Sequence, residues 1–360
     1  MDSVTQIVLG AAVGHATAKK TLGRKAALWG AVFGTLPDLD VFYSYGDPVS
    51  DFTFHRSATH SLVLMSIAAP VIAALISYWR TRLRKESFQE VFWPWLRLIF
   101  LCLTTHALLD AFTVYGTQLL WPITDYPFAI GSIFIIDPLY TIPLLIGLLI
   151  TLIRQPNTSF SRSANAIGMV LSSAYLLWSV IAQSWVGNSL RSTLQQEHIA
   201  YDKTLITPAP FTTFLWRVVA INEHSYYDGY RSIFDDRTNI QLKRFSRNTH
   251  LASELPDNWY RNRLDWFSKG FNKYWLHNSQ VVMSDLRMGM EPSYVFTFAI
   301  GKVSMTDQQL PEERQILPPI QVLQDRDMTL LNSVWRRIWD EQVNMHDMTK
   351  TECVDKLTSC

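Results

Sequence analysis

Four apolar segments in the first 186 residues restrict the fold most strongly, because each approaches the length of a membrane-spanning helix. A helix needs about 20 residues to cross a bilayer. Within hydrocarbon every backbone polar group must be hydrogen-bonded inside the protein, so such segments are expected to be helical. The four segments are Ser61–Trp79, Leu98–Thr113, Ile133–Ile153 and Ala164–Val186.

Two shorter apolar segments, Val4–Ala18 and Ala26–Leu36, precede them and flank a basic turn. Neither is long enough to cross a bilayer comfortably, and we expect a pair of short helices buried against the spanning ones. Residues 1–186 are therefore predicted to form an α-helical multi-pass membrane bundle, with about four spanning helices and two short N-terminal ones.

The second half of the chain carries charges throughout and contains short β-type runs, which indicates a small α+β extramembrane domain over residues 211–360. Residues 187–210, which include Thr207-Pro208-Ala209-Pro210, are predicted to be a linker. Helical periodicity is expected over Leu251–Phe267 and Met328–Val343. The predicted strands are Phe214–Ile221, Tyr226–Phe234, Asn239–Phe245, Tyr274–Leu276, Gln280–Met283 and Tyr294–Ile300.

Basic residues are unevenly distributed among the predicted loops. Arginine and lysine lie between the first two and between the last two predicted spans, whereas residues 114–132 contain neither. The positive-inside rule then places the basic loops in the cytoplasm and the C-terminal domain on the outer, periplasmic side. The formal net charge is only +1, so no global basic field indicates a nucleic-acid partner.

Ionisable side chains are scarce in the predicted bundle, and most of those present are of a metal-ligating type. Charged groups are costly in or near hydrocarbon, so they usually mark a functional site. Imidazoles and carboxylates are ligands of zinc, manganese and iron. The candidate metal ligands are His15, Asp38, His55, His60, His106, Asp110 and Asp137, and the candidate catalytic residues are Asp40 and Arg56.

His106 and Asp110 form the sharpest local pattern. Four residues apart on a helix, they project from one face about one turn apart, within reach of a shared ion. A hydrogen-bonded polar pair between helices is an alternative of similar weight. Asp38 and Asp40 follow Pro37 in a turn that suits either an oxygen-rich metal site or a solvated turn.

The remaining candidates also have two interpretations. His55 and His60 are either ligands or amphipathic side chains at the membrane interface, and Arg56 is either an anion-binding group or an interfacial anchor. His15 lies among small residues that suit a packing face, and Asp137 precedes a proline at a position that suits a helix N-cap. Their joint occurrence, mostly on one predicted side of the bundle, favours the metal site.

Together these motifs resemble the inner-membrane metal-dependent hydrolase family of YdjM type. The resemblance covers about the first 150 residues and implies a location in the bacterial inner membrane. Phe214–Val219 and Asp285–Gly289 resemble a C-terminal extension that some members carry. The matching stretches of the first part are His15, Pro37–Asp40, His55–Ser61, His106–Thr117 and Ile136–Tyr140.

That family is in turn distantly similar to zinc-dependent phospholipase C and single-strand nucleases, which are helical proteins that bind a zinc cluster. A second His-x₃-Asp or His-x₃-Glu pair is missing from the membrane half of this chain, so one or two ions are expected rather than three. The ligands that the resemblance implies are His106 and Asp110 as a His-x₃-Asp pair, one of Asp38 or Asp40, and one of His55 or His60.

The leading functional hypothesis is a membrane-embedded metal-dependent hydrolase of an ester or phosphodiester. One or two divalent ions, with Zn²⁺ favoured, would lower the pKa of bound water toward neutrality. Asp40 would orient that water or act as base, and Arg56 would hold a phosphate oxygen. A membrane lipid is the favoured substrate over other small molecules. The alternative is a non-catalytic membrane protein with a structural metal site and an outer binding domain.

Overall fold

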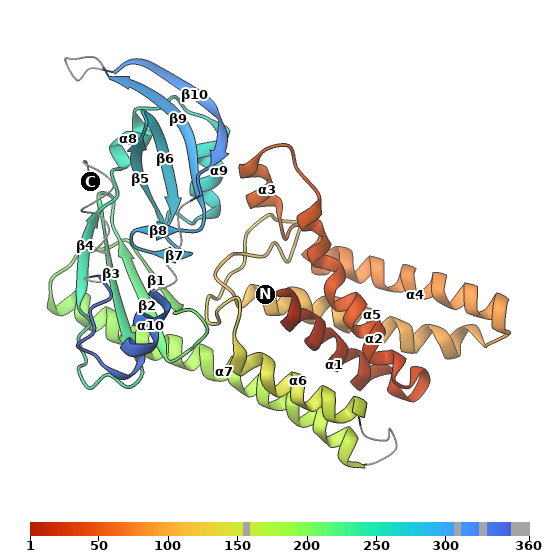
Figure 1. Ribbon diagram of the computed structural model, residues 1–360. Helices are drawn as coiled ribbons and strands as arrows, with labels where there is room; N and C mark the ends of the chain where they lie inside the picture. Colours follow the sequence, from red (N-terminus) through yellow and green to blue (C-terminus); the bar gives the residue numbers. More distant parts are fainter. Residues whose placement is uncertain (154–158, 306–310, 324–329, 347–360) are drawn as a thin grey trace. The chain divides into compact units, whose positions relative to one another are not determined.

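The computed structural model describes residues 1–153, 159–305, 311–323 and 330–346, which form two compact units. Unit 1 consists of Met1–Tyr43 and His55–Val180, and unit 2 consists of Ser44–Phe54 and the chain from Ile181 onward. Unit 1 is helical, whereas unit 2 is built on antiparallel sheets with a few helices (Figure 1). The expected membrane bundle followed by a small α+β domain is thereby confirmed.

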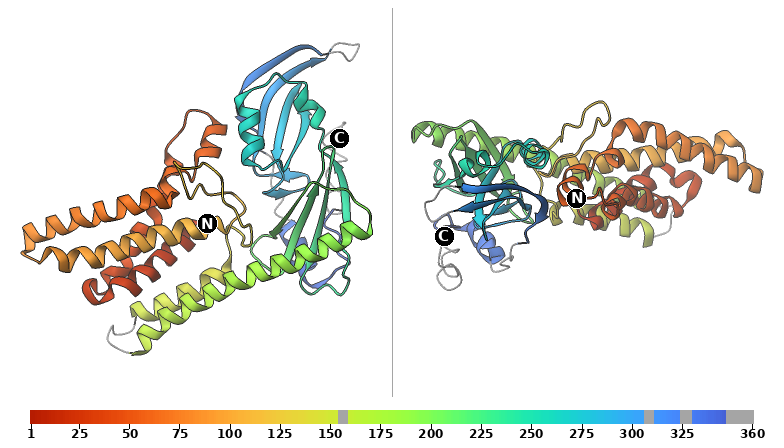
Figure 2. Two further views of the ribbon diagram at one scale, coloured as in Figure 1. Left: turned by 180° about the vertical axis from the view of Figure 1, so that it is seen from behind. Right: turned by 90° about the horizontal axis from the view of Figure 1, so that it is seen from above.

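Helices α4 (Leu62–Arg84) and α5 (Phe88–Ala111) of unit 1 lie side by side and are long and apolar enough to cross a membrane (Figure 1). Helix α7 (Ser159–Gln196) meets the same criterion over residues 163–196 and continues without a break into unit 2 (Figure 2). Helix α6 (Pro138–Ile153) has 16 residues and is shorter than the predicted span, because residues 133–137 are not helical.

Helices α1 (Ser3–Leu22) and α2 (Lys25–Thr35) form the expected N-terminal pair, and glycines bring their backbones into contact. A Cβ atom added to Gly14 would lie 2.5 Å from the carbonyl oxygen of Ala26, and one added to Gly34 would lie 2.8 Å from that of Gln6. Gly10 and Gly30 face each other in the same way. Small residues at helix interfaces permit such close approach.

The first sheet of unit 2 is antiparallel, in the order β1-β2-β3-β4, and one face is covered by the second half of α7. Trp216, Val218 and Ala220 of β2 pack against α7, while Leu215 and Val219 point to the other face. Strand β2 is buried on both faces and therefore reads as a continuous apolar run. The strands are β1 (Lys203–Pro208), β2 (Leu215–Ile221), β3 (Ser225–Ser232) and β4 (Leu242–Ser246).

The second sheet has the order β10-β9-β6-β5, and a two-stranded ribbon pairs β7 with β8. The aromatic ring of Phe52 packs against Phe267 and Phe298, with ring centroids 4.9 and 5.3 Å away. The elements are α3 (Pro48–Phe54), α8 (Thr249–Ser253), α9 (Trp259–Phe267), β5 (Asn272–His277), β6 (Gln280–Asp285), β7 (Gly289–Met290), β8 (Ser293–Tyr294), β9 (Thr297–Met305), β10 (Pro311–Gln321) and α10 (Leu330–Trp339).

Two segments of unit 2 differ from expectation. Residues 187–210, predicted to be a linker, hold the end of α7 and strand β1. The single helix predicted over Leu251–Phe267 is wrong at residues 254–258, because Pro256 separates α8 from α9.

We predict that Gly30→Ala destabilises unit 1, because its new Cβ would meet the backbone of α1, which no rotamer change can relieve. Overpacking of this kind costs about 1–3 kcal/mol, which thermal unfolding in detergent would detect. Gly187→Ala is the matched control, since its Cβ would lie 3.6 Å from the nearest side-chain atom. That control should be neutral or stabilising, because alanine favours helix. Equal melting of both variants would contradict the close-packing argument.

Candidate metal centre

Four side chains of unit 1 converge on one point, and we call them the metal group. They come from the 3-10 helix η1 (Leu36–Phe42), the 3-10 helix η2 (Ala58–His60) and the last turns of α5. One ligand atom from each lies within 4.8 Å of the other three. The members of the metal group are Asp38, His60, His106 and Asp110.

The separations within the metal group suit a single small cation. His60 Nε2 lies 3.1 Å from His106 Nε2 and 3.1 Å from Asp110 Oδ2. His106 Nε2 lies 3.3 Å from Asp38 Oδ1 and 3.6 Å from Asp110 Oδ2. A tetrahedral ion with ligand bonds of about 2.0–2.2 Å needs ligand atoms roughly 3.3–3.6 Å apart. Two of these four separations fall in that range and two are 0.2 Å shorter, so the four groups could hold one ion.

Hydrogen bonds on the far side of each imidazole direct its Nε2 toward the metal group. His106 Nδ1 lies 2.6 Å from the carbonyl oxygen of Gly34, which can only accept, so Nδ1 carries the proton. His60 Nδ1 lies 2.9 Å from Thr59 Oγ1, whose hydroxyl donates to Asp40 Oδ2 at 2.7 Å. His60 Nδ1 is therefore also the donor. Outer partners of this kind fix the tautomer of metal-ligating histidines.

The Asp110 carboxylate is fully buried, and its two oxygens have different surroundings. Oδ1 accepts a hydrogen bond from Gln6 Nε2 at 3.0 Å and contacts the amino group of Met1. Oδ2 lies 3.2 Å from Arg56 Nε, but among the described residues no N–H or O–H is aligned to donate to it. A buried acceptor facing two imidazole nitrogens is costly unless a cation or a proton lies between them.

The close approach of these groups shifts the pKa values of the η1 carboxylates and of the η2 imidazole. Burial would raise the pKa of Asp38, but hydrogen bonds from His106 and His60 lower it well below its usual range. The pKa of Asp40 is likewise lowered, because the adjacent His55 outweighs burial. Burial opposes the charged form of His60, yet Asp110 and Asp38 raise its pKa. The carboxylates are thus held in their charged form beside two imidazoles, which favours a proton or a metal ion between them.

Asp40, His55 and Arg56 border the metal group without belonging to it. His55 Nδ1 lies 2.9 Å from Asp40 Oδ1, and the His55 side chain is 23% exposed. Arg56 is buried, its Nη1 donates to Thr113 Oγ1 at 3.3 Å, and its guanidinium lies 5.0 Å from the ring centroid of Tyr115. These side chains place an acid–imidazole pair and a fixed positive charge beside the metal group.

Two further candidate ligands lie apart from the metal group. Asp137 accepts hydrogen bonds from the backbone N–H of Leu139 and from Tyr175 Oη, at 3.0 and 2.9 Å, so it caps the start of α6. His15 is buried in the middle of α1. The structure therefore gives Asp137 the contacts of an N-cap and His15 the buried position of a packing residue, and it brings neither of them into the metal group.

Sequence reasoning did not anticipate the roles of Gln6, Thr59 and the Gly34 carbonyl. Gln6 is a fully buried polar residue in an apolar helix, and that placement was a usable signal. Thr59 lies between two candidate ligands, but its bond to Asp40 depends on how the chain folds back. A backbone carbonyl carries no sequence signal.

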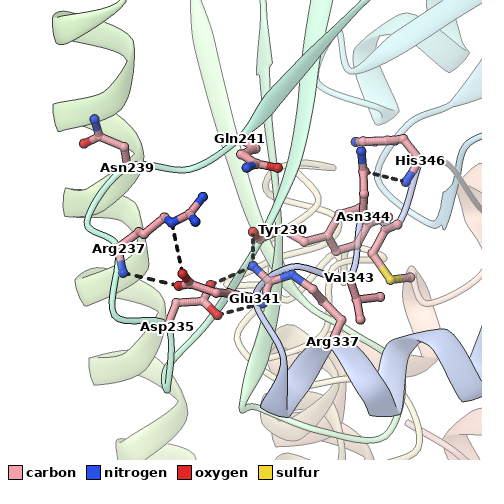
Figure 3. Close-up of a pocket in the computed structure, with 11 residues that line it drawn as sticks. Tyr230, Asp235, Arg237, Asn239, Gln241, Arg337, Glu341, Val343, Asn344 and His346 are labelled. Carbon is pink, nitrogen blue, oxygen red and sulfur yellow. Dashed lines mark hydrogen bonds and ion pairs between the residues drawn. The ribbon is translucent and has the colours of Figure 1, made fainter.

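Unit 2 contains a small pocket, which is lined by residues of β3 and α10 and by the segments that follow them (Figure 3). Arg337 Nη1 and Nη2 each donate to the Asp235 carboxylate at 2.7 Å, and Arg237 Nε lies 3.0 Å from Glu341 Oε1. The volume of about 30 Å³ holds little more than water. Because its charges are paired internally, this pocket is a weaker candidate than the metal group.

The residues of the metal group lie within a segment that matches a known protein family. Residues 1–186 match the family model described as YdjM inner membrane protein. The uncharacterized protein YfhP of Bacillus subtilis (strain 168) is 26% identical over 237 residues, which is 64% of this chain and 68% of that protein. No solved structure matches the chain significantly.

We predict that His60→Ala abolishes metal binding, whereas His55→Ala retains it. The two histidines lie five residues apart, but only His60 contributes a ligand atom to the metal group. The measurement is the metal-to-protein ratio of detergent-purified protein by elemental mass spectrometry. Loss of metal in both variants, or in neither, would contradict the assignment.

We also predict that Thr59→Val lowers metal affinity by about 10–100-fold, the usual effect of losing an outer hydrogen-bond partner. The change keeps the shape of the side chain but removes the hydroxyl that holds His60 Nδ1. Thr59→Ser keeps the hydroxyl and should bind metal nearly as well as the unmodified chain. Competition with a chelator of known affinity measures all three.

Proposed function

Because the chain belongs to the YdjM inner membrane protein family and gathers four metal-ligating side chains, we propose that it is a membrane-embedded metal-dependent hydrolase. The proposed substrate is an ester or phosphodiester, and a membrane lipid is favoured. The site is formed by the end of the apolar helix α5 and by two short helices that precede the apolar helix α4. A substrate already held in the bilayer therefore has the shortest path to it.

In this proposal Asp38, His60, His106 and Asp110 hold one divalent ion, with Zn²⁺ favoured by the mixed imidazole and carboxylate ligands. Such an ion would act as a Lewis acid and, with a water as an added fifth ligand, would lower the pKa of that water toward neutrality. The chain's own residues must then accept a proton and balance the negative charge that develops.

Asp40 and His55 are the proposed proton acceptor, and this pair carries the argument for catalysis over a purely structural role. Thr59 and the backbone N–H of Arg56 donate to Asp40 Oδ2 and fix its position. The other oxygen lies 2.9 Å from His55 Nδ1, and we assign proton uptake to the second nitrogen of that ring, Nε2. The partly exposed ring of His55 is accessible to water, and a structural metal site has no need of such a pair.

Arg56 is proposed to balance charge beside the ion. Its guanidinium lies close to Asp110 and on the ring of Tyr115, so its position is fixed before substrate arrives. A preorganised positive charge in a buried site stabilises developing negative charge more strongly than it would in water.

A structural metal site is the second candidate function. Four protein ligands would fill the tetrahedral coordination shell of zinc, as in sites that only stabilise a fold. Unit 2 would then serve as a binding module. A metal-loaded protein that turns over no ester, phosphodiester or phospholipid would favour this alternative.

We predict that Asp40→Asn and His55→Gln keep the metal but lower hydrolysis about 10²–10⁴-fold, the usual contribution of a general base. The assays are release of a chromophore from a phosphodiester and an ester, and hydrolysis of phospholipid vesicles, with metal content measured in parallel. His224→Gln is the matched control, because His224 is exposed in unit 2. Full activity of both site variants would refute the proton-acceptor assignment.

A further inference from the structure

We propose that unit 1 binds an anionic phospholipid in a second site, which we call the headgroup groove. The groove lies between the α1–α2 turn, the last turns of α4 and the first half of α5. Its volume is about 820 Å³, within the usual range for small-molecule sites. The proposal does not depend on the metal group or on hydrolysis.

The charged lining of the groove is exclusively basic. Lys25, Arg80 and Arg84 line it, and no acidic residue does. Arg80 Nη2 donates to Glu86 Oε1 at 2.7 Å, but Arg80 Nε is buried and has no hydrogen-bond acceptor in the part of the chain that the structure describes. A groove with this lining is complementary to a phosphate group, and basic pockets between membrane helices bind anionic lipid headgroups.

Trp95 gives an independent reason to expect a polar ligand. It lines the groove, is only 4% exposed, and packs edge-on against Trp29 with ring centroids 5.3 Å apart. Its indole Nε1 is buried without an acceptor among the described residues. A buried tryptophan N–H normally has a partner, and the oxygens of a phosphodiester headgroup supply acceptors.

The groove also offers a surface for an acyl chain. Leu75, Trp79 and Leu83 line it from α4 and are 56%, 65% and 75% exposed. Helix α4 is long and apolar enough to span a membrane and ends at Arg84, so the basic residues lie where hydrocarbon gives way to headgroups. Tryptophan is enriched at that depth. Basic groups beside an apolar wall match one lipid better than a free phosphate ion.

The headgroup groove is well separated from the metal group. Trp95 precedes His106 on α5 by eleven residues, which is about 16 Å along a helix. Variants of the groove are therefore expected to leave the metal content unchanged, which makes metal content a check that unit 1 is folded.

Native mass spectrometry of the full chain in detergent tests the proposal with dioleoyl phosphatidylglycerol, dioleoyl phosphatidylcholine and inorganic phosphate. We expect roughly tenfold or more preference for phosphatidylglycerol over phosphatidylcholine, and no competition by millimolar phosphate. Lys25→Gln with Arg84→Gln should remove the preference. Arg82→Gln with Arg97→Gln removes the same charge outside the groove and should keep it, since these residues instead contact Tyr78 and the Trp93 carbonyl.

Trp95→Phe keeps an aromatic ring and removes the N–H, and it should weaken phosphatidylglycerol binding several-fold. It also serves as the test if the double variant fails to fold, as judged by metal content and thermal unfolding. Equal binding of the two lipids, or equal loss in both double variants, would overturn the proposal. Displacement of phosphatidylglycerol by inorganic phosphate would overturn it in favour of a free-anion site.

Discussion

The charge of Asp110 is the constraint on which the helical unit depends. This carboxylate is fully buried at the end of an apolar helix, where the helix dipole also disfavours a negative charge. A lone buried ion of this kind costs several kcal/mol. Arg56, the amino group of Met1 and Gln6 offset that cost, and they come from two segments far from α5 in sequence. Burying one acid therefore requires α1, the segment around Arg56 and α5 to assemble together.

Most of the helices could be predicted from local sequence patterns. Elements that depend on pairing between distant segments could not. Hydropathy identifies α4 and α5 because apolar length is a property of the segment itself. Strand β1 ends in Pro208 and resembles a linker in isolation, and only its antiparallel pairing with β2 makes it a strand. The break at Pro256 was a local signal that the helical periodicity around it obscured.

The candidate site shows the same contrast between local signals, which the sequence contains, and long-range ones, which it does not. His106 and Asp110 share one helix face, so their proximity follows from spacing alone. Which of His55 and His60 joins them depends on how the chain turns at Arg56, whose positive φ of 63° has no marker in the sequence. The headgroup groove was missed for a related reason, because its basic and tryptophan side chains are spread over α2, α4 and α5.

Helix α2 connects the two ends of this unit. Lys25 and Trp29 near its start line the groove, while the carbonyl oxygen of Gly34 near its end accepts a hydrogen bond from His106 Nδ1. Asp38 follows within the next turn of chain. Helix α2 packs backbone-to-backbone against α1 along much of its length. A ligand that moved the start of α2 as a whole would also move the Gly34 carbonyl that orients the His106 ring.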